Sequence, residues 1–451
     1  MQLSVKEKVS YGAGAVGKDM VYALVSGFLM YYYNTVLGIS ATFIGVLFMG
    51  ARVFDAFNDP LMGIIVEKTH TPLGKFRPWL IIGTLINAIV LVAMFSMPEG
   101  LTGTSLLVYA SIAYILWGVT YTIMDIPYWS MIPAITEHGK DRENLSVIAR
   151  SCAGLGFAFP VALTMLLVPI LGAGNERAGF SKLSIIVAIL FILALTVTVT
   201  NVKEKIKLKA KSPTIKEMIT ALMRNDQAIV VVIAIVIFNA SLYLTQQLAI
   251  YFFKYDIGNA ALFGIFGTVG GLAQILSMML VPVFRKKLET KSLLVAAIGL
   301  TLIGYSLLFI LGIFNIREMV LLSIAAIIIF MGFGVATVLT TVFLADSVDY
   351  GEWKNGHRSE SVVFSLQTFV VKLASAFSVL IAGVGLDVIG LDINAVTQTS
   401  STLSGLRVLM IIVPMVGLIA SVWFFVKKYK LDDDLLQTIG VDLKLQREET
   451  H

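Results

Sequence analysis

Two aspartates lie four residues apart in an otherwise apolar stretch, "ARVFDAFNDP" (residues 51–60). On a helix, Asp55 and Asp59 share one face, with Arg52 one turn before Asp55. Carboxylate oxygens are the ligands that small hard cations prefer. An ionised side chain at the middle of a bilayer costs about 2.5–3.5 kcal/mol on insertion scales, which favours a functional reason for keeping it. We therefore predict a site for Na+ or Li+ here, with Asn58 adding an amide oxygen.

The same charges have a structural alternative. Arg52 and Lys372, a lysine in a later apolar segment, would tie helices together through ion pairs with these aspartates. Two acids on one helix face exceed what a single ion pair needs, so the pattern favours a binding site.

A second polar stripe falls in "LWGVTYTIMDIPYWS" (residues 116–130), where Tyr121, Asp125 and Trp129 follow one another at intervals of four. Residues at this spacing lie along one face of a helix. A carboxylate accepts hydrogen bonds from hydroxyl groups, and an indole ring packs against the apolar C–H face of a sugar. Thr122 points away from the stripe and is expected to reach the segment of the aspartate pair as a neutral oxygen ligand.

Further charges in apolar segments complete a set of groups suited to a polyol. Asp19 accepts hydrogen bonds, and Arg150 donates them in a planar fork. Lys18 is either a further donor to the sugar or only the partner that neutralises Asp19. The aromatic residues of the stripe have an ordinary alternative, because membrane aromatics often pack or anchor at the interface.

The composition indicates a membrane protein. Of the 451 residues, 57% are hydrophobic and 14% are charged, whereas soluble domains are near one half and one quarter. We predict an all-α fold with twelve membrane-spanning helices, since each of twelve apolar segments approaches the length needed to cross a bilayer. Their predicted ranges are 10–36, 41–66, 79–97, 105–134, 147–171, 183–201, 228–253, 259–284, 292–315, 318–345, 361–386 and 405–426.

Lysine and arginine concentrate at the N-terminus, at the C-terminus and in alternate loops. Because positively charged loops stay in the cytoplasm, we expect both termini there. This bias also explains the net charge of +5 without a nucleic acid partner. The long basic segment 202–227 separates a six-helix half (1–201) from a second one (228–427), followed by a cytoplasmic tail (428–451). Such a layout is typical of transporters with a midplane site between two halves.

Histidine and cysteine offer little material for catalysis inside the membrane. All four histidines fall in predicted loops or the tail, and Cys152 is the single cysteine, which excludes an intramolecular disulfide. The sequence shows no nucleophile elbow, phosphate loop or zinc-binding helix pattern. We therefore expect no enzyme activity and no cofactor. The polar first ten residues also show no removable signal peptide.

Short cytoplasmic loops of mixed charge suggest a gate. The segment "ADSVDYGEWKNGHRSES" (345–361) is predicted as a loop that forms ion pairs with other cytoplasmic charges in one transport state. The alternative is a solvated surface, where exposed ion pairs contribute only about 0–1 kcal/mol. The residues of the predicted gate are Arg142, Asp346, Asp349, Arg358 and Glu360.

Several motifs together resemble one known family. "YGAGAVGKD", "ARVFDAFNDPLMG", "GKFRPW", "YTIMDIPYWS", "ADSVDYGEW" and "QTFVVKLASAF" look like the glycoside–pentoside–hexuronide:cation symporter family of the major facilitator superfamily, and most of all like its melibiose branch. The likeness covers nearly the whole chain. It implies the major facilitator fold, a location in the cytoplasmic membrane of a bacterium, and inward transport of an α-galactoside coupled to Na+, Li+ or H+.

Carried over position by position, the resemblance implies roles for individual residues. It places a galactosyl unit at Lys18, Asp19, Asp125, Trp129 and Arg150, with Tyr121 beside them and Gln367 and Thr368 lining the other half. It places the cation at Asp55, Asp59 and Thr122, with Asn58 and Lys372 close by. Thr337 departs from the melibiose branch, which presents a tryptophan there, and so removes an aromatic wall from the sugar site.

Other functions stay open on the sequence alone. The same fold serves carriers of other glycosides or pentosides, a related branch carries lysolipids, and a sensor would use the fold without transport. The acids Asp19 and Asp125 with Arg150 suit a sugar better than a lipid. Membrane lipid surrounds the chain in each case, and the middle loop offers a place for a cytoplasmic regulatory protein.

Overall fold

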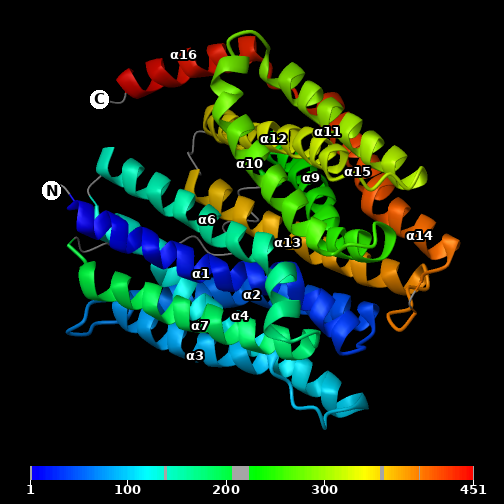
Figure 1. Cartoon of the computed structure of the whole chain (residues 1–451). Helices are drawn as coiled ribbons and strands as arrows, with labels where there is room; N and C mark the ends of the chain where they lie inside the picture. The colour runs from blue at the N-terminus through cyan, green and yellow to red at the C-terminus, as the bar shows by residue number, and fades with distance from the viewer. Residues whose placement is uncertain (1–2, 137–139, 206–222, 356–359, 396, 450–451) are drawn as a thin grey trace. The chain divides into compact units, whose positions relative to one another are not determined.

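The computed structural model describes residues 3–136, 140–205, 223–355, 360–395 and 397–449. Within these ranges the regular structure is helical throughout (Figure 1), which confirms the all-α prediction. The chain divides into two compact units. The first comprises residues 1–211 and 392–395, and the second comprises residues 212–391 and 396–451.

Seven α-helices build the described part of the first unit. In this unit α1 packs closely against α6 and α7, whereas α4 packs against α3 and α2, and α3 against α7. The sites discussed below lie along α1, α2 and α4. The bounds are α1 (Val5–Tyr31), continued by the π-helical turn η1 (Tyr32–Val36), α2 (Ala41–Glu67), α3 (Arg77–Phe95), α4 (Gly103–Ser130), α5 (Ile132–Ile135), α6 (Lys140–Leu171) and α7 (Glu176–Asn201).

The second unit is organised around two long helices. α12 packs against α10 and α11, and α9 packs against α13 and α15, while α16 lies on α12. The bounds are α9 (Asp226–Tyr251), continued by η2 (Phe252–Asp256), α10 (Ala261–Phe284), α11 (Thr290–Ile313), α12 (Met319–Asn355), α13 (Glu360–Val388), α14 (Ser400–Arg407), η3 (Val408–Ile412), α15 (Val413–Lys428) and α16 (Asp433–Glu449).

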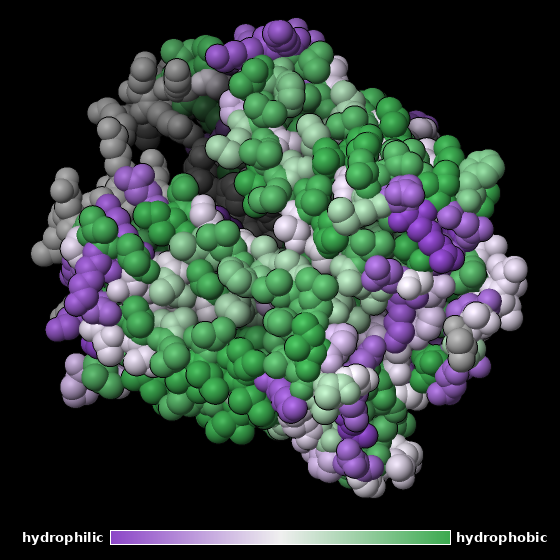
Figure 2. All heavy atoms as spheres, in the orientation of Figure 1, coloured by the Kyte–Doolittle hydropathy of each residue, from purple (hydrophilic) through white to green (hydrophobic). Residues whose placement is uncertain are grey.

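Ten helices in the described part of the chain are long and apolar enough to cross a membrane. They correspond to predicted spans three to twelve. The other two, α1 and α2, have 27 residues each, about 40 Å of helix, which exceeds the roughly 30 Å of a hydrocarbon core. On the face in Figure 2, hydrophobic side chains form broad areas between hydrophilic groups near the helix ends. A count of twelve spans stays a prediction.

The loop predicted at 345–361 is wrong over most of its length, because α12 continues to Asn355. Its polar side chains find partners that keep them in the helix. Lys354 Nζ lies 2.6 Å from the carboxylate of Asp226, and the indole of Trp353 donates to Asp442 on α16. Charge along the segment therefore marks contacts between α12, α9 and α16 rather than a chain reversal.

Both ends of the chain are also more helical than predicted. α1 begins at Val5, five residues before its predicted start, because Ser4 and Glu7 form a capping box. The predicted tail contains α16, whose Ile439 and Leu443 are buried.

Candidate functional site

One ammonium group links α1 to α4 inside the first unit. Lys18 Nζ lies 2.9 Å from the Asp19 carboxylate and 2.8 Å from that of Asp125. Lys18 is 2% exposed, and both aspartates are partly exposed. Two carboxylates thus share one positive charge, so the cluster carries a net charge of −1 when all three groups are ionised. It can accept hydrogen bonds from hydroxyl groups, as the sequence predicted for Asp19 and Asp125.

Trp129 brings Arg150 of α6 to the same cluster. Lys18 Nζ lies 4.8 Å from the centre of the Trp129 ring, and the guanidinium carbon of Arg150 lies 5.5 Å from it. Trp129 is half-buried and Arg150 is exposed. Cations this close to an indole are attracted by its π-face. The structure therefore assembles Lys18, Asp19, Asp125, Trp129 and Arg150 from three helices.

Tyr121 has a more structural setting. It is buried, and its ring packs against Trp117 and Tyr22 at centroid distances of 5.2 and 5.7 Å. Its hydroxyl makes a long contact of 3.5 Å with the Lys18 carbonyl. These contacts agree with the ordinary alternative, in which this aromatic side chain packs between helices.

Two of the predicted cation ligands, Asp59 and Thr122, meet between α2 and α4. The Thr122 hydroxyl donates to Asp59 Oδ1 at 3.1 Å, so Thr122 reaches α2 as the spacing predicted. Asp55 and Thr122 are buried, and Asp59 is half-buried. In the described part of the chain, Asn58 Nδ2 is buried without a hydrogen-bond partner. Asp55 and Asn58 lie on the same helix as Asp59, four residues and one residue before it, so this part of α2 and Thr122 offer two carboxylates, a hydroxyl and an amide, a donor set suited to a hard monovalent cation.

Arg52 pairs within its own helix. Its Nη1 lies 3.6 Å from Asp55 Oδ2, three residues along α2, and its guanidinium carbon lies 5.8 Å from the ring centre of Tyr22 on α1. The ion pair therefore runs along α2. Arg52 reaches its neighbouring helix through an aromatic ring instead.

The two groups share α4. Asp125 contacts α1 and Thr122 contacts α2, although the two residues are only three positions apart. A helix places such residues one turn apart along its axis. Any rotation or shift of α4 thus changes both groups together.

The predicted residues of the second unit are only partly described. Lys372 is half-buried on α13, and Thr337 on α12 donates to the Phe333 carbonyl of its own helix. Asp346 and Asp349 are half-buried on α12. The other predicted residues of this unit, and Arg142 of the first unit, have side chains outside the described part of the structure: Arg142, Arg358, Glu360, Gln367 and Thr368.

Two polar pairs were not predicted from the sequence. Tyr11 on α1 and Tyr128 on α4 bond to each other's backbone, and Arg407 makes two hydrogen bonds, 2.8 and 2.6 Å long, to the buried Asp256. Tyr128 lies seven residues after Tyr121, a spacing that extends the stripe on α4. No comparable signal links Asp256 to Arg407, which are far apart in the sequence.

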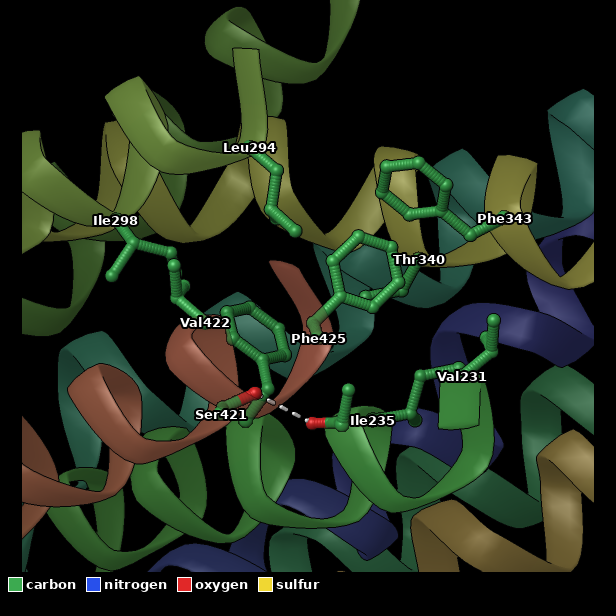
Figure 3. A pocket seen from close by; sticks show the side chains of 11 residues that line it. Val231, Ile235, Leu294, Ile298, Thr340, Phe343, Ser421, Val422 and Phe425 are labelled. Carbon is green, nitrogen blue, oxygen red and sulfur yellow. Dashed lines mark hydrogen bonds between the residues drawn. The ribbon is translucent and has the colours of Figure 1, made fainter. Parts of the chain in front are cut away.

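A separate cavity lies in the second unit, between α9, α11, α12 and α15 (Figure 3). Ile298 of α11 and Val422 of α15 line it with Phe343 of α12 and Phe425. Its polar lining comes from hydroxyl groups, and that of Ser421 already donates to the Ala234 carbonyl. With this apolar lining it does not suit a cation or a sugar.

Comparison with known proteins gives relatives along the whole chain. It is 30% identical over 450 residues to an uncharacterized symporter, YjmB, of Bacillus subtilis, covering 98% of this chain and 96% of that protein. It is also 30% identical to an isoprimeverose transporter of Lactiplantibacillus pentosus, covering 95% and 90%. A lactose permease of Lactobacillus delbrueckii is 26% identical over 100% of this chain and 74% of its own length.

Solved structures share the fold. A point mutant of the nucleoside transporter NupG superposes with a TM-score of 0.68 at 15% identity, covering 94% of this chain and all of that one. At this identity the likeness concerns the fold alone.

A family model for sugar transporters matches nearly the full chain, over residues 10–433. Together with the ten apolar helices, this match confirms the expectation of a multi-pass membrane protein. The chain belongs to the MFS/sugar transport protein family.

Proposed function

We propose that this protein is a cation-coupled symporter of small glycosides. The observation that carries the proposal is the sharing of α4 by two polar groups, one built around Lys18, Asp19 and Asp125 and the other around Asp59 and Thr122. A sugar at the first group and a cation at the second would both act on one helix. The family to which the chain belongs makes transport the function to test first.

The proposed sugar site uses the carboxylates of Asp19 and Asp125 as acceptors and Lys18 and Arg150 as donors, with Trp129 as a stacking surface. Gln367 and Thr368 would line it from the second unit. We propose an α-galactoside such as melibiose as the substrate. A relative named as a lactose permease supports a galactoside, and one named as an isoprimeverose transporter keeps other glycosides as alternatives. Thr337 would leave room for a larger sugar.

The proposed cation site consists of Asp55, Asp59 and Thr122, with Asn58 and Lys372 as neighbours. Na+, Li+ or H+ there would reduce the repulsion between the two carboxylates and fix α2 against α4. If both ligands favour one arrangement of α4, each raises the other's affinity by the same factor. Coupling of about 1–3 kcal/mol corresponds to roughly 5- to 150-fold.

Alternating access would then follow from rocking of two six-helix halves about a midplane site. This model includes twelve spans, both termini in the cytoplasm, and a cytoplasmic gate at Arg142, Asp346, Asp349, Arg358 and Glu360. A regulatory protein that bound segment 202–227 would act on the same movement.

The decisive experiment measures uptake of radiolabelled melibiose, lactose and raffinose into proteoliposomes, with and without gradients of Na+, Li+ and H+. We expect accumulation of at least one sugar that depends on a cation gradient. Asp125→Cys is expected to abolish sugar binding, and Asp55→Cys to abolish cation stimulation. Asp434→Cys, an exposed tail acid, provides the matched control.

Two results would count against the proposal. Uptake that was independent of all three gradients would contradict coupling to a cation. Normal cation-driven accumulation in the Asp125→Cys variant would contradict the proposed sugar site. A chemically altered sugar after uptake would instead indicate an enzyme.

A further inference from the structure

Two tyrosines join α1 and α4 in a reciprocal arrangement. The Tyr11 hydroxyl donates to the Tyr128 carbonyl at 2.5 Å, and the Tyr128 hydroxyl donates to the Tyr11 carbonyl at 2.5 Å. Their rings stack with centroids 4.5 Å apart and planes 17° apart. Both side chains are fully buried. We call this pair the tyrosine clasp.

The clasp lies next to the charged cluster. Tyr11 precedes Lys18 by seven residues, two turns along the same face of α1, and Tyr128 follows Asp125 by three on α4. Lys18 Nζ lies 5.6 Å from the centre of the Tyr128 ring. The tyrosine clasp and the Lys18–Asp125 ion pair are thus successive ties across one seam between two helices.

Close packing at Gly14 of α1 holds the Tyr11–Tyr128 pair in place. A Cβ at Gly14 would lie 3.0 Å from the Tyr128 ring and closer still to the Thr198 hydroxyl of α7. That hydroxyl donates to the Ser10 carbonyl at 2.7 Å. Tyr128 of α4 and Thr198 of α7 therefore both approach the backbone of α1 at Gly14, and the missing side chain permits this close approach.

The close neighbours of α1 are α6 and α7, and those of α4 are α3 and α2. Contact between α1 and α4 therefore depends on long side chains such as Tyr11 and Tyr128. Stacked rings alone allow the helices to slide, since ring contact tolerates a range of offsets. Hydrogen bonds are directional, and two antiparallel ones are lost together when either helix shifts along its axis.

We propose that Tyr11 and Tyr128 are positioning residues for the sugar site. Their reciprocal bonds set the register of α1 against α4, and so the spacing of Asp19 from Asp125 around Lys18. The inference rests on the proposed function and adds two residues to it that act through others. It also separates the two ligands, because loss of the bonds would shift α1 against α4, while α4 keeps its close packing against α2, where the cation group lies.

The test uses Tyr11→Phe, Tyr128→Phe and the double variant in the full-length protein. Each substitution removes one hydroxyl and keeps the stacked ring and its face toward Lys18. Titration calorimetry at saturating Na+ measures the Kd for melibiose, lactose and raffinose, and a separate titration measures the Kd for Na+. Each single variant is expected to weaken sugar binding about fivefold to tenfold, as loss of a buried hydrogen bond would. Na+ affinity should stay within about twofold.

The double variant supplies a further criterion. Since the two bonds fix one register, removing both should weaken sugar binding little more than removing one. The effects of two independent sites would instead add. Tyr109→Phe is the matched control, because Tyr109 also lies on α4 and donates to a backbone carbonyl, that of Ala93 on α3. It should leave sugar affinity unchanged.

Sugar affinity equal to wild type in a folded single variant would overturn the positioning role. So would an equal loss of sugar and Na+ affinity, which would indicate general loosening. If one variant fails to fold, the other tests the same pair. A wild-type protein that binds none of the three sugars would overturn the proposed function, and this inference with it.

Discussion

Lys18 pairs with Asp19, as one of its two sequence-based roles predicts, and its role as a donor to the sugar stays a prediction. An ammonium has three hydrogens, and two carboxylates lie within 3 Å of it. It therefore neutralises Asp19 and also ties α1 to α4. Replacement of Lys18 would leave two carboxylates facing each other in partly buried surroundings, which is more costly than loss of either acid alone.

At Thr122 we expect a single hydroxyl to affect cation binding and not sugar binding. Thr122→Ala removes the donor to Asp59 and the proposed neutral ligand, so we expect the Na+ concentration for half-maximal stimulation to rise about tenfold, as for a hydrogen bond to a charged group. Sugar affinity at saturating Na+ should change little. Thr122→Ser should restore the wild-type value, and uptake titrated with Na+ measures all three.

Thr120→Ala is the control for Thr122. This hydroxyl is on the same helix but accepts from Asn87 on α3, away from α2. An equal rise in the Na+ requirement for Thr120→Ala would show that loss of any buried hydroxyl on α4 has this effect, and would contradict a specific role for Thr122.

At the scale of elements, the motif "YGAGAVGKD" explains how α1 can serve several neighbours. Its small residues let α6 and α7 approach, Tyr11 binds α4, and Lys18 and Asp19 face the charged cluster. α6 also has a small residue at its contact with α1, because a Cβ at Gly156 would collide with the Val16 carbonyl. α6 also carries Arg150, so this contact places the guanidinium beside Trp129.

Gly156→Ala should therefore push α1 and α6 apart, because a backbone carbonyl cannot move aside as a side-chain end can. We expect a loss of about 1–3 kcal/mol of stability, the usual effect of overpacking, seen as a lower temperature of unfolding in detergent. Sugar affinity should fall as well, since Arg150 moves with α6.

Gly154→Ala, two residues earlier on the same helix, is the matched control, because its Cβ would meet nothing within 4 Å. It should unfold at or slightly above the wild-type temperature, since alanine favours a helix. Equal destabilisation by both substitutions would show that close packing at Gly156 is not the cause.

At the scale of the whole molecule, the sequence predicted most helix positions, because apolar length dominates in a membrane. It also predicted that Thr122 reaches the helix of Asp59, since one helix fixes the direction of its own side chains. It did not predict the Lys18–Asp125 ion pair, the tyrosine clasp or the Asp256–Arg407 pair, because each joins distant segments whose register is set by packing. Hydrogen bonds from the end of α12 to Asp226 and Asp442 likewise extended α12 beyond its apolar part.

The predicted orientation can be tested with single cysteines, since Cys152 is the only native one. In a Cys152→Ser background, we expect a membrane-impermeant maleimide to label Glu99→Cys from outside intact cells. Leu445→Cys and Lys287→Cys should react only after the membrane is opened. Labelling of Leu445→Cys in intact cells would contradict cytoplasmic termini and an even number of crossings.

The residues just after α7 hold the end of this helix against the start of α3 and against α1. Glu204 accepts hydrogen bonds from the backbone of Lys75 and Phe76 before α3, and Lys205 pairs with Glu7 of α1 at 2.7 Å. α9 has its own start in the N-cap Asn225. A gene divided between codons 205 and 223 would thus leave each product with its helix-end contacts. Two polypeptides made side by side in one cell should then assemble into a working carrier.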